Sequence, residues 1–294
     1  MQKRILTVER PFHLSVRNAQ LILRDKESEE EHQRPLEDIG VLVLENERTT
    51  FTNALLQAAL EHNVAVVICD TQHMPSGLFM PLRHNTLMQE RHEAQVKATD
   101  ALKARLWQRT VEAKTKNQAL LLDQRAKAGD PLHYMATQVE RGDTTNVEAR
   151  AAKRYWEMLF VIEFSRERYG NWPNPALNYG YAIMRAAMAR ALVGAGLLPS
   201  LGIHHHNRYN PYCLADDIME PYRPFVDAAV LEIMEIGHTE LNKEAKMTLL
   251  QVLHSDVRGG SKANVLMAEL DKTAASLAQC FLGEAKAIHY PSLL

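Results

Sequence analysis

Residues 89–124 read QERHEAQVKATDALKARLWQRTVEAKTKNQALLLDQ, without a single glycine or proline. Ala, Lys, Gln, Leu and Glu dominate this stretch, and all five are good helix formers. The stretch therefore predicts extended helical structure. The sequence Gly129-Asp130-Pro131 ends it, because glycine and proline both interrupt helices. The character of the chain changes just before this stretch, near residues 82–87.

The residues before this point are β-rich. Short apolar runs between turn residues predict strands at 4–6, 41–44, 64–69 and 78–80. They also predict a hairpin of residues 14–16 with 20–23, turning near Asn18. Segment 50–61 differs, because its apolar residues fall at helical spacing and Thr50 or Thr52 can cap the helix.

The residues after the stretch favour helices. Apolar spacing and small-residue content predict helices over residues 144–164, 179–195, 216–236, 242–253 and 261–282. The small residues of 179–195 permit close approach between helices, and the pair Gly259-Gly260 is interpreted as a helix breaker. The sequence thus predicts an α+β fold. A small β-rich domain spans residues 1–82, and a larger all-helical domain spans residues 83–294.

Composition is that of an ordinary globular protein. Of 294 residues, 46% are hydrophobic and 24% are charged, which argues against global disorder and a collagen-like chain. The net charge of −2 gives no global attraction to nucleic acid. Cys69, Cys213 and Cys280 lie far apart, so reduced thiols are expected. No apolar run nears the roughly 20 residues of a membrane span, and the start lacks a secretory signal. We therefore expect a cytoplasmic protein with no membrane partner.

Positive charge is concentrated between residues 82 and 128. The basic residues there are Arg83, Arg91, Lys97, Lys103, Arg105, Arg109, Lys114, Lys116, Arg125 and Lys127. A surface of this kind is consistent with phosphate contacts. A solvated helix face accounts for the same pattern.

The densest group of polar side chains lies at residues 202–223, GIHHHNRYNPYCLADDIMEPYR. One histidine with two or three carboxylates is a ligand set for Mg²⁺ or Mn²⁺. Asp217 and Glu220 are three residues apart and share a face if they lie on a helix. The same residue types also have less specific roles. The three histidines can bind zinc fortuitously or form a plain surface loop, and Asp216 can be only an N-cap.

Glu148 is a second candidate. It lies about one turn into the helix predicted over 144–164, for which we expect Thr144 or Thr145 as the cap. Taken alone, it is typical of a first-turn glutamate that favours the helix dipole. No nucleophile elbow, Walker A loop, dinucleotide fingerprint or HExxH zinc motif is present.

Three segments in order resemble one known family. They are GDTTNVEARAAKRYW (142–156), ALNYGYAIMRAAMARALVGAGL (176–197) and LGIHHHNRYNPYCLADDIMEPYRPFVD (201–227). The N-terminal segments FHLSVRNAQLIL (12–23) and VAVVICD (64–70) extend the likeness over nearly the whole chain. Together they resemble the CRISPR-associated integrase, the metal-dependent endonuclease that captures new spacers. The version they resemble most accompanies type II, single-effector systems.

The resemblance implies a catalytic metal site. Carried over position by position, its Mg²⁺ or Mn²⁺ ligands and catalytic residues are Glu148, His205 and Glu220. His205 is chosen because it stands three residues after Gly202, although the neighbouring histidines leave its register ambiguous by one. Asp217 matches the acidic position before the last ligand, where it acts through water or orients a neighbour.

The resemblance also implies a reaction and partners. A DNA 3′-hydroxyl attacks a phosphodiester of the CRISPR repeat and joins prespacer DNA to it, while water in its place gives nuclease activity. The family works as a homodimer through its β domains, and two homodimers bracket a dimer of a small ferredoxin-like subunit in a heterohexamer. Prespacer phosphates are expected on residues 85–128, with Arg83, His84 and Lys97 as candidate contacts.

Two other functions are weighed against this one. The same cluster can serve a metal-dependent DNA nuclease that does not join strands. A non-catalytic scaffold that binds DNA or a partner is the third possibility. Glu148 separates the two enzymes from the scaffold, because both enzymes need it beside His205 and Glu220. Integrase and nuclease differ in their product, which is joined strands or cut ones.

Overall fold

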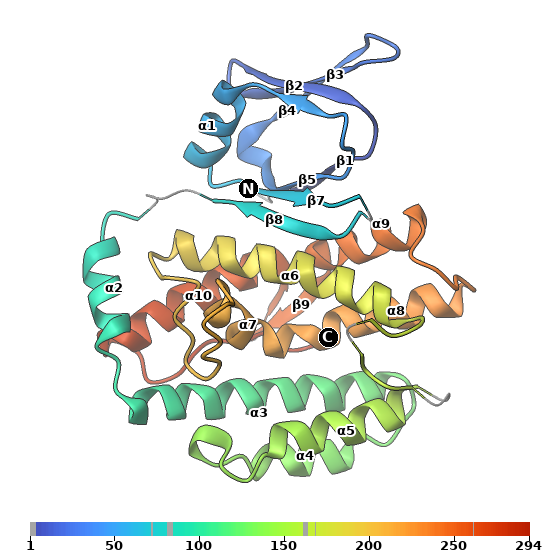
Figure 1. Ribbon diagram of the computed structural model, residues 1–294. Helices are drawn as coiled ribbons and strands as arrows, with labels where there is room; N and C mark the ends of the chain where they lie inside the picture. The colour runs from blue at the N-terminus through green and yellow to red at the C-terminus, as the bar shows by residue number, and fades with distance from the viewer. Residues whose placement is uncertain (1–3, 72, 81–84, 161–163, 168, 261) are drawn as a thin grey trace. The chain divides into compact units, whose positions relative to one another are not determined.

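The computed structural model describes residues 4–71, 73–80, 85–160, 164–167, 169–260 and 262–294 (Figure 1). The chain divides into two compact units, Met1–Met88 and Gln89–Leu294. The first is strand-rich and the second mostly helical, as the predicted α+β class requires. No helix in these described ranges is both long and apolar enough to cross a membrane.

The first unit holds two four-stranded sheets. In one, strands β1 (Arg4–Val8), β5 (Ile39–Leu44) and β7 (Ala65–Cys69) run parallel, and β8 (Pro75–Phe79) is antiparallel to β7. The other has the order β4-β3-β2-β6, with bounds Glu31–Pro35, Gln20–Asp25, Phe12–Arg17 and Thr50–Phe51.

The predicted hairpin and helix of this unit are confirmed. Strand β2 pairs with β3, and Asn18 and Ala19 have φ values of 51° and 57°, which a tight two-residue hairpin turn needs. Helix α1 (Asn53–Glu61) is capped by Thr52, whose side chain accepts a hydrogen bond from the Leu55 amide at 3.2 Å. Leu14 and Leu55 form the core together with Leu42 and Leu44 of β5 and Val66 of β7.

The second unit is built around two long helices, α3 (Asp100–Gln124) and α6 (Asn174–Gly194). Helix α3 packs against α4 and α5, and α6 packs against α7, α8, α9 and α10 (Figure 1). The remaining elements are α2 (Met88–Val96), α4 (Asp130–Thr137), η2 (Arg141–Asp143), α5 (Val147–Leu159), α7 (Cys213–Met219), η3 (Glu220–Tyr222), α8 (Arg223–Glu235), α9 (Lys243–Gln251), η4 (Val252–His254) and α10 (Leu266–Leu282).

Several details of this unit differ from the sequence prediction, among them a strand pair and a helix boundary. The unit is not all-helical, because β9 (Asp256–Gly259) and β10 (Lys262–Val265) form an antiparallel hairpin and α10 begins only at Leu266. Gly260, with φ of 73°, belongs to the hairpin connection and is not a break between helices. The glycine-free stretch is also divided, since Thr99 caps α3 by accepting from the Leu102 amide at 3.2 Å.

The small-residue pattern of α6 does permit close helix approach, and Gly180 tests this. A Cβ atom at Gly180 would lie 2.4 Å from Cγ1 of Val226 on α8 and 3.2 Å from Cδ2 of Leu249 on α9. We expect Gly180→Ala to destabilise the protein by roughly 1–3 kcal/mol through overpacking. Alanine's better helix propensity, about 1 kcal/mol, offsets part of that cost. A denaturant midpoint at or above that of the parent protein would contradict the close packing.

Candidate active site

Glu148 stands in the first turn of α5, where a carboxylate fixes its backbone. Asp143 accepts hydrogen bonds from the amides of Val147 at 2.8 Å and Glu148 at 2.9 Å. Asp143 therefore caps this helix, and the expectation that Thr144 or Thr145 does so is wrong. The Thr144 hydroxyl donates instead to Glu140 at 3.1 Å. Each of the two carboxylate oxygens of Asp143 accepts from a different first-turn amide, so one side chain satisfies two of the unpaired donors of the helix start.

Glu220 begins the short helix η3, directly after α7. Pro221 follows it, at a position where the missing amide hydrogen costs little. Asp216 is not an N-cap, because α7 already begins at Cys213. Its carboxylate accepts from Arg185 at 2.6 Å and from Asn210 at 2.7 Å.

The structure brings Glu148 and Glu220 together through Lys114 of α3. The Lys114 Nζ lies 2.7 Å from Glu148 Oε1 and 2.5 Å from Glu220 Oε2. On the other side of Glu220, Arg223 Nε donates to Oε1 at 2.8 Å. Burial alone would raise the pKa of Glu220, but Arg223 and Lys114 outweigh it and lower that pKa to about 2. Glu220 is therefore a carboxylate at neutral pH.

His205 is oriented by Asp217. Its Nδ1 donates to Asp217 Oδ1 at 2.5 Å, and this hydrogen bond is the largest cause of a raised His205 pKa. The fully buried Asp217 also accepts from the backbone amides of Ile203 at 2.7 Å, His204 at 2.9 Å and His205 at 3.2 Å. One carboxylate thus fixes both the loop and the imidazole. The Nε2 atom is left as the nitrogen that can ligate a metal.

The three consecutive histidines have different environments. The ring of His204 stacks on the buried Trp107, with centroids 4.1 Å apart and an interplanar angle of 2°. Burial lowers the pKa of His204 and the neighbouring His205 adds to this, so its ring is disposed to stay neutral. His206 is exposed and lines a cavity. Among the three, His205 is the one for which the structure shows an ion pair with a carboxylate.

A buried cluster of Asp227 and two tyrosines lies beside Arg223. Asp227 of α8 accepts hydrogen bonds from the hydroxyls of Tyr155 at 2.7 Å and Tyr181. Burial raises the pKa of Asp227 to about 6. The guanidinium of Arg223 lies over the ring of Tyr181, 4.6 Å from its centroid. The ring of Tyr181 on α6 and the charge of Asp227 on α8 therefore both stabilise the guanidinium that pairs with Glu220.

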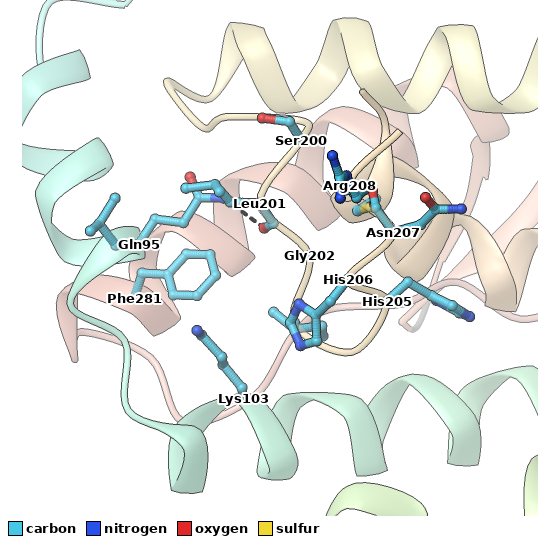
Figure 2. A pocket seen from close by; sticks show the side chains of 13 residues that line it. Gln95, Lys103, Ser200, Leu201, Gly202, His205, His206, Asn207, Arg208 and Phe281 are labelled. Atoms are coloured by element: carbon cyan, nitrogen blue, oxygen red, sulfur yellow. Dashed lines mark hydrogen bonds between the residues drawn. The ribbon is translucent and has the colours of Figure 1, made fainter. Parts of the chain in front are cut away.

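A cavity of about 340 Å³ adjoins His205 (Figure 2). Lys103 reaches toward it from α3, and Gln95 and Phe281 line the side away from the histidine loop. Gln95 Nε2 donates to the carbonyls of Leu198 at 3.0 Å and Leu201 at 3.1 Å, which anchors the loop. Lys103 and Arg208 give the lining a positive character.

The candidate DNA contacts have separate outcomes. Arg83 and His84 lie outside the described residues. Lys97 is exposed, and its Nζ lies 2.8 Å from Glu93 Oε2, one turn earlier. Because the Glu93 carboxylate partly neutralises the Lys97 ammonium, Lys97 is a weaker phosphate ligand than the sequence alone indicates.

The chemistry of the donor set fits a hard divalent cation. The candidate donors are the carboxylates of Glu148 and Glu220 and the imidazole of His205. The Nδ1 of that imidazole donates to a third carboxylate, that of Asp217, an arrangement common around metal-binding histidines. Glu220 Oε2 is buried and makes no hydrogen bond of good geometry within the part of the chain described. No group of three or more His, Cys, Asp or Glu side chains converges as a ready ligand cage in that part. The Lys114 ammonium lies between the two carboxylates instead.

Sequence reasoning selected Glu148, His205, Glu220 and Asp217. The structure connects Glu148 with Glu220 through Lys114, and it connects His205 with Asp217. Sequence reasoning missed Lys114, which appeared only as one of ten basic residues in its segment. It also missed Asp143 as the cap of α5, although an acidic residue shortly before a helix is a recognisable signal.

Comparison with known proteins bears on this site. Residues 6–256 match the family model described as "CRISPR associated protein Cas1". The CRISPR-associated endonuclease Cas1 of Neisseria meningitidis serogroup C (strain 8013) is 37% identical over 280 residues, which cover 94% of this chain and 91% of that protein.

Solved structures show the same fold. A casposase bound to its integration product superposes with a TM-score of 0.78 at 20% identity, covering 98% of this chain and 93% of that one. A chain of a Cas6-RT-Cas1–Cas2 complex superposes with a TM-score of 0.74 at 20% identity, covering 97% of this chain and 35% of the longer one. With the family match and the Neisseria relative, the likeness read from three sequence segments is confirmed: the chain belongs to the Cas1 family of CRISPR-associated proteins.

Proposed function

We propose that this protein is a metal-dependent DNA endonuclease and integrase of CRISPR adaptation, acting in the cytoplasm. The observation that carries the proposal is the convergence of Glu148 and Glu220 on one cation, beside a histidine oriented by Asp217. A non-catalytic scaffold does not require Glu148 and Glu220 to contact one buried ammonium. Endonuclease is also the activity in the name of the Neisseria relative.

Glu148, His205 and Glu220 are the residues that would hold Mg²⁺ or Mn²⁺. When bound, the metal lowers the pKa of the attacking hydroxyl and stabilises negative charge at the reacting phosphate. The protein's own contribution is positional. Asp217 keeps the His205 ring fixed with Nε2 available, and Arg223 holds Glu220 ionised and in place. The attack of a DNA 3′-hydroxyl joins strands, and the attack of water cuts them.

The partners follow from the same proposal. The substrates are prespacer DNA and the CRISPR repeat, with Lys103 and Arg208 near the site as candidate phosphate contacts. Strand joining is supported by the fold shared with a casposase bound to its integration product. The proposed assembly is a homodimer through the strand-rich unit, which joins a small ferredoxin-like subunit in a heterohexamer. Association with a partner subunit is supported by the similar chain in a Cas6-RT-Cas1–Cas2 complex.

A strand-transfer assay tests this function. The purified protein, with and without the small subunit, meets a labelled duplex with 3′-hydroxyl ends and a supercoiled plasmid that carries the repeat. We expect covalent joining with Mn²⁺ or Mg²⁺ and none with EDTA. Cutting without joining, with the subunit present, would favour the plain nuclease. If the folded protein binds DNA but neither cuts nor joins it, the result would favour the non-catalytic scaffold.

A further inference from the structure

Lys114 has an unusual place for a lysine. Its side chain is only 10% exposed, halfway along α3, and its ammonium contacts two carboxylates that come from other elements. Burial lowers its pKa, but Glu220 and Glu148 outweigh burial and raise it. The cation is therefore held by these two carboxylates rather than by solvent.

The charges around this point balance without any added ion. Glu148 and Glu220 supply two negative charges, and Lys114 and Arg223 supply two positive ones. A divalent cation placed between the carboxylates would meet the ammonium at close range. In a buried site such like-charge repulsion is weakly screened. For the metal to bind, Lys114 or Arg223 therefore has to move away from the two carboxylates.

The two resident cations differ in how firmly they are held. Arg223 is fixed by its hydrogen bond to Glu220 and by its position over the ring of Tyr181. Lys114 carries a compact charge on a flexible four-carbon stem, which can reorient as a guanidinium clamped in this way cannot. Lys114 is thus the cation that can be displaced, and it is the one that touches both carboxylates.

We infer that Lys114 is a resident counter-cation that competes with the divalent metal for Glu148 and Glu220. Metal loading is then an exchange, in which the ammonium leaves the carboxylate pair as the metal enters. In the protein without metal, Lys114 compensates the charges of the buried Glu220 and the partly buried Glu148 and keeps the site folded. This inference rests on the proposed metal site, and it accounts for the convergence of the donors on a lysine.

Lys114→Met tests the exchange, because methionine keeps most of the length of the side chain and removes the charge. Lys116→Met is the matched control, two residues along the same helix and exposed. Mn²⁺ binding to the full-length proteins is measured by the EPR signal of free Mn²⁺, and thermal unfolding is followed in EDTA and in Mn²⁺. No readout depends on activity.

We expect Lys114→Met to bind Mn²⁺ about tenfold or more tightly than the parent protein, since a buried competing cation is gone. In EDTA its Tm should fall, and Mn²⁺ should raise that Tm more than it raises the parent's. Lys116→Met should match the parent in both. If Lys114→Met does not fold in EDTA, Lys114→Gln is measured in the same way, because it is also neutral and stays polar.

Two results would overturn the inference. The first rejects only the exchange, and the second also rejects the proposed metal-dependent function. Mn²⁺ binding by the parent, with equal or weaker binding by the neutral Lys114 variant, would make Lys114 a structural ion pair and leave the metal site intact. No Mn²⁺ binding by either protein would remove the proposed metal-dependent function itself, and the exchange with it.

Discussion

Replacing Glu148 with glutamine is expected to lower metal-dependent cutting and joining of DNA by more than about 100-fold. Loss of a partner that only orients a metal ligand typically costs 10–100-fold, and loss of a charged ligand removes more. The fold should survive, because Glu148 is 23% exposed and glutamine keeps its shape. Its backbone stays capped by Asp143. The measurement is the rate of strand transfer and of nicking under saturating Mn²⁺.

Glu157→Gln is the control for this change. It makes the same substitution in the same helix, at an exposed position on the far turn of α5. We expect it to react as the parent does. If Glu148→Gln, folded to the same Tm as its control, also reacts at the parent's rate, Glu148 is not a ligand and the proposed site is wrong.

The parts of the fold that the sequence predicts well are governed by local patterns. The hairpin near Asn18, helix α1 and the buried strand β7 follow from spacing and turn chemistry alone. The β9–β10 hairpin was missed because its strands are only four residues long and precede a strong helical pattern. The break before α3 was missed because its sequence signal is one threonine N-cap, Thr99, within a stretch rich in good helix formers.

The residues of the candidate site also fall into those that the sequence pattern identifies and those that only tertiary packing reveals. Position in a family pattern selects Glu148, His205, Glu220 and Asp217, although no local rule brings them together. Lys114 could not be selected, because its role arises only when α3 lies against η3 and α5. One buried lysine among ten basic residues has no sequence signature. Which of three adjacent histidines meets Asp217 is likewise decided by tertiary packing, with His204 taken by Trp107.

Removing the carboxylate of Asp217 is expected to cause the largest loss of stability that a single change in this site can produce. In Asp217→Ala, the amides of Ile203, His204 and His205 and the His205 ring all lose their acceptor. A buried donor left without a partner costs about 1–3 kcal/mol, and more when charge is involved. Water can reach part of the loop, so we expect a net loss of about 3–5 kcal/mol, as for a broken buried ion pair.

Thermal unfolding followed by circular dichroism measures this loss, which corresponds to a Tm lower by roughly 6–20 °C for a unit of this size. Asp216→Ala is the matched control, because Asp216 is the next residue and its ion-pair partner Arg185 is 42% exposed. Its Tm should fall less. Asp217→Asn keeps one acceptor oxygen and should lie between the two. A Tm for Asp217→Ala at or above that of Asp216→Ala would mean that the histidine loop is held by Gln95 and by Trp107 stacking alone. The orientation of His205 could then no longer be assigned to Asp217.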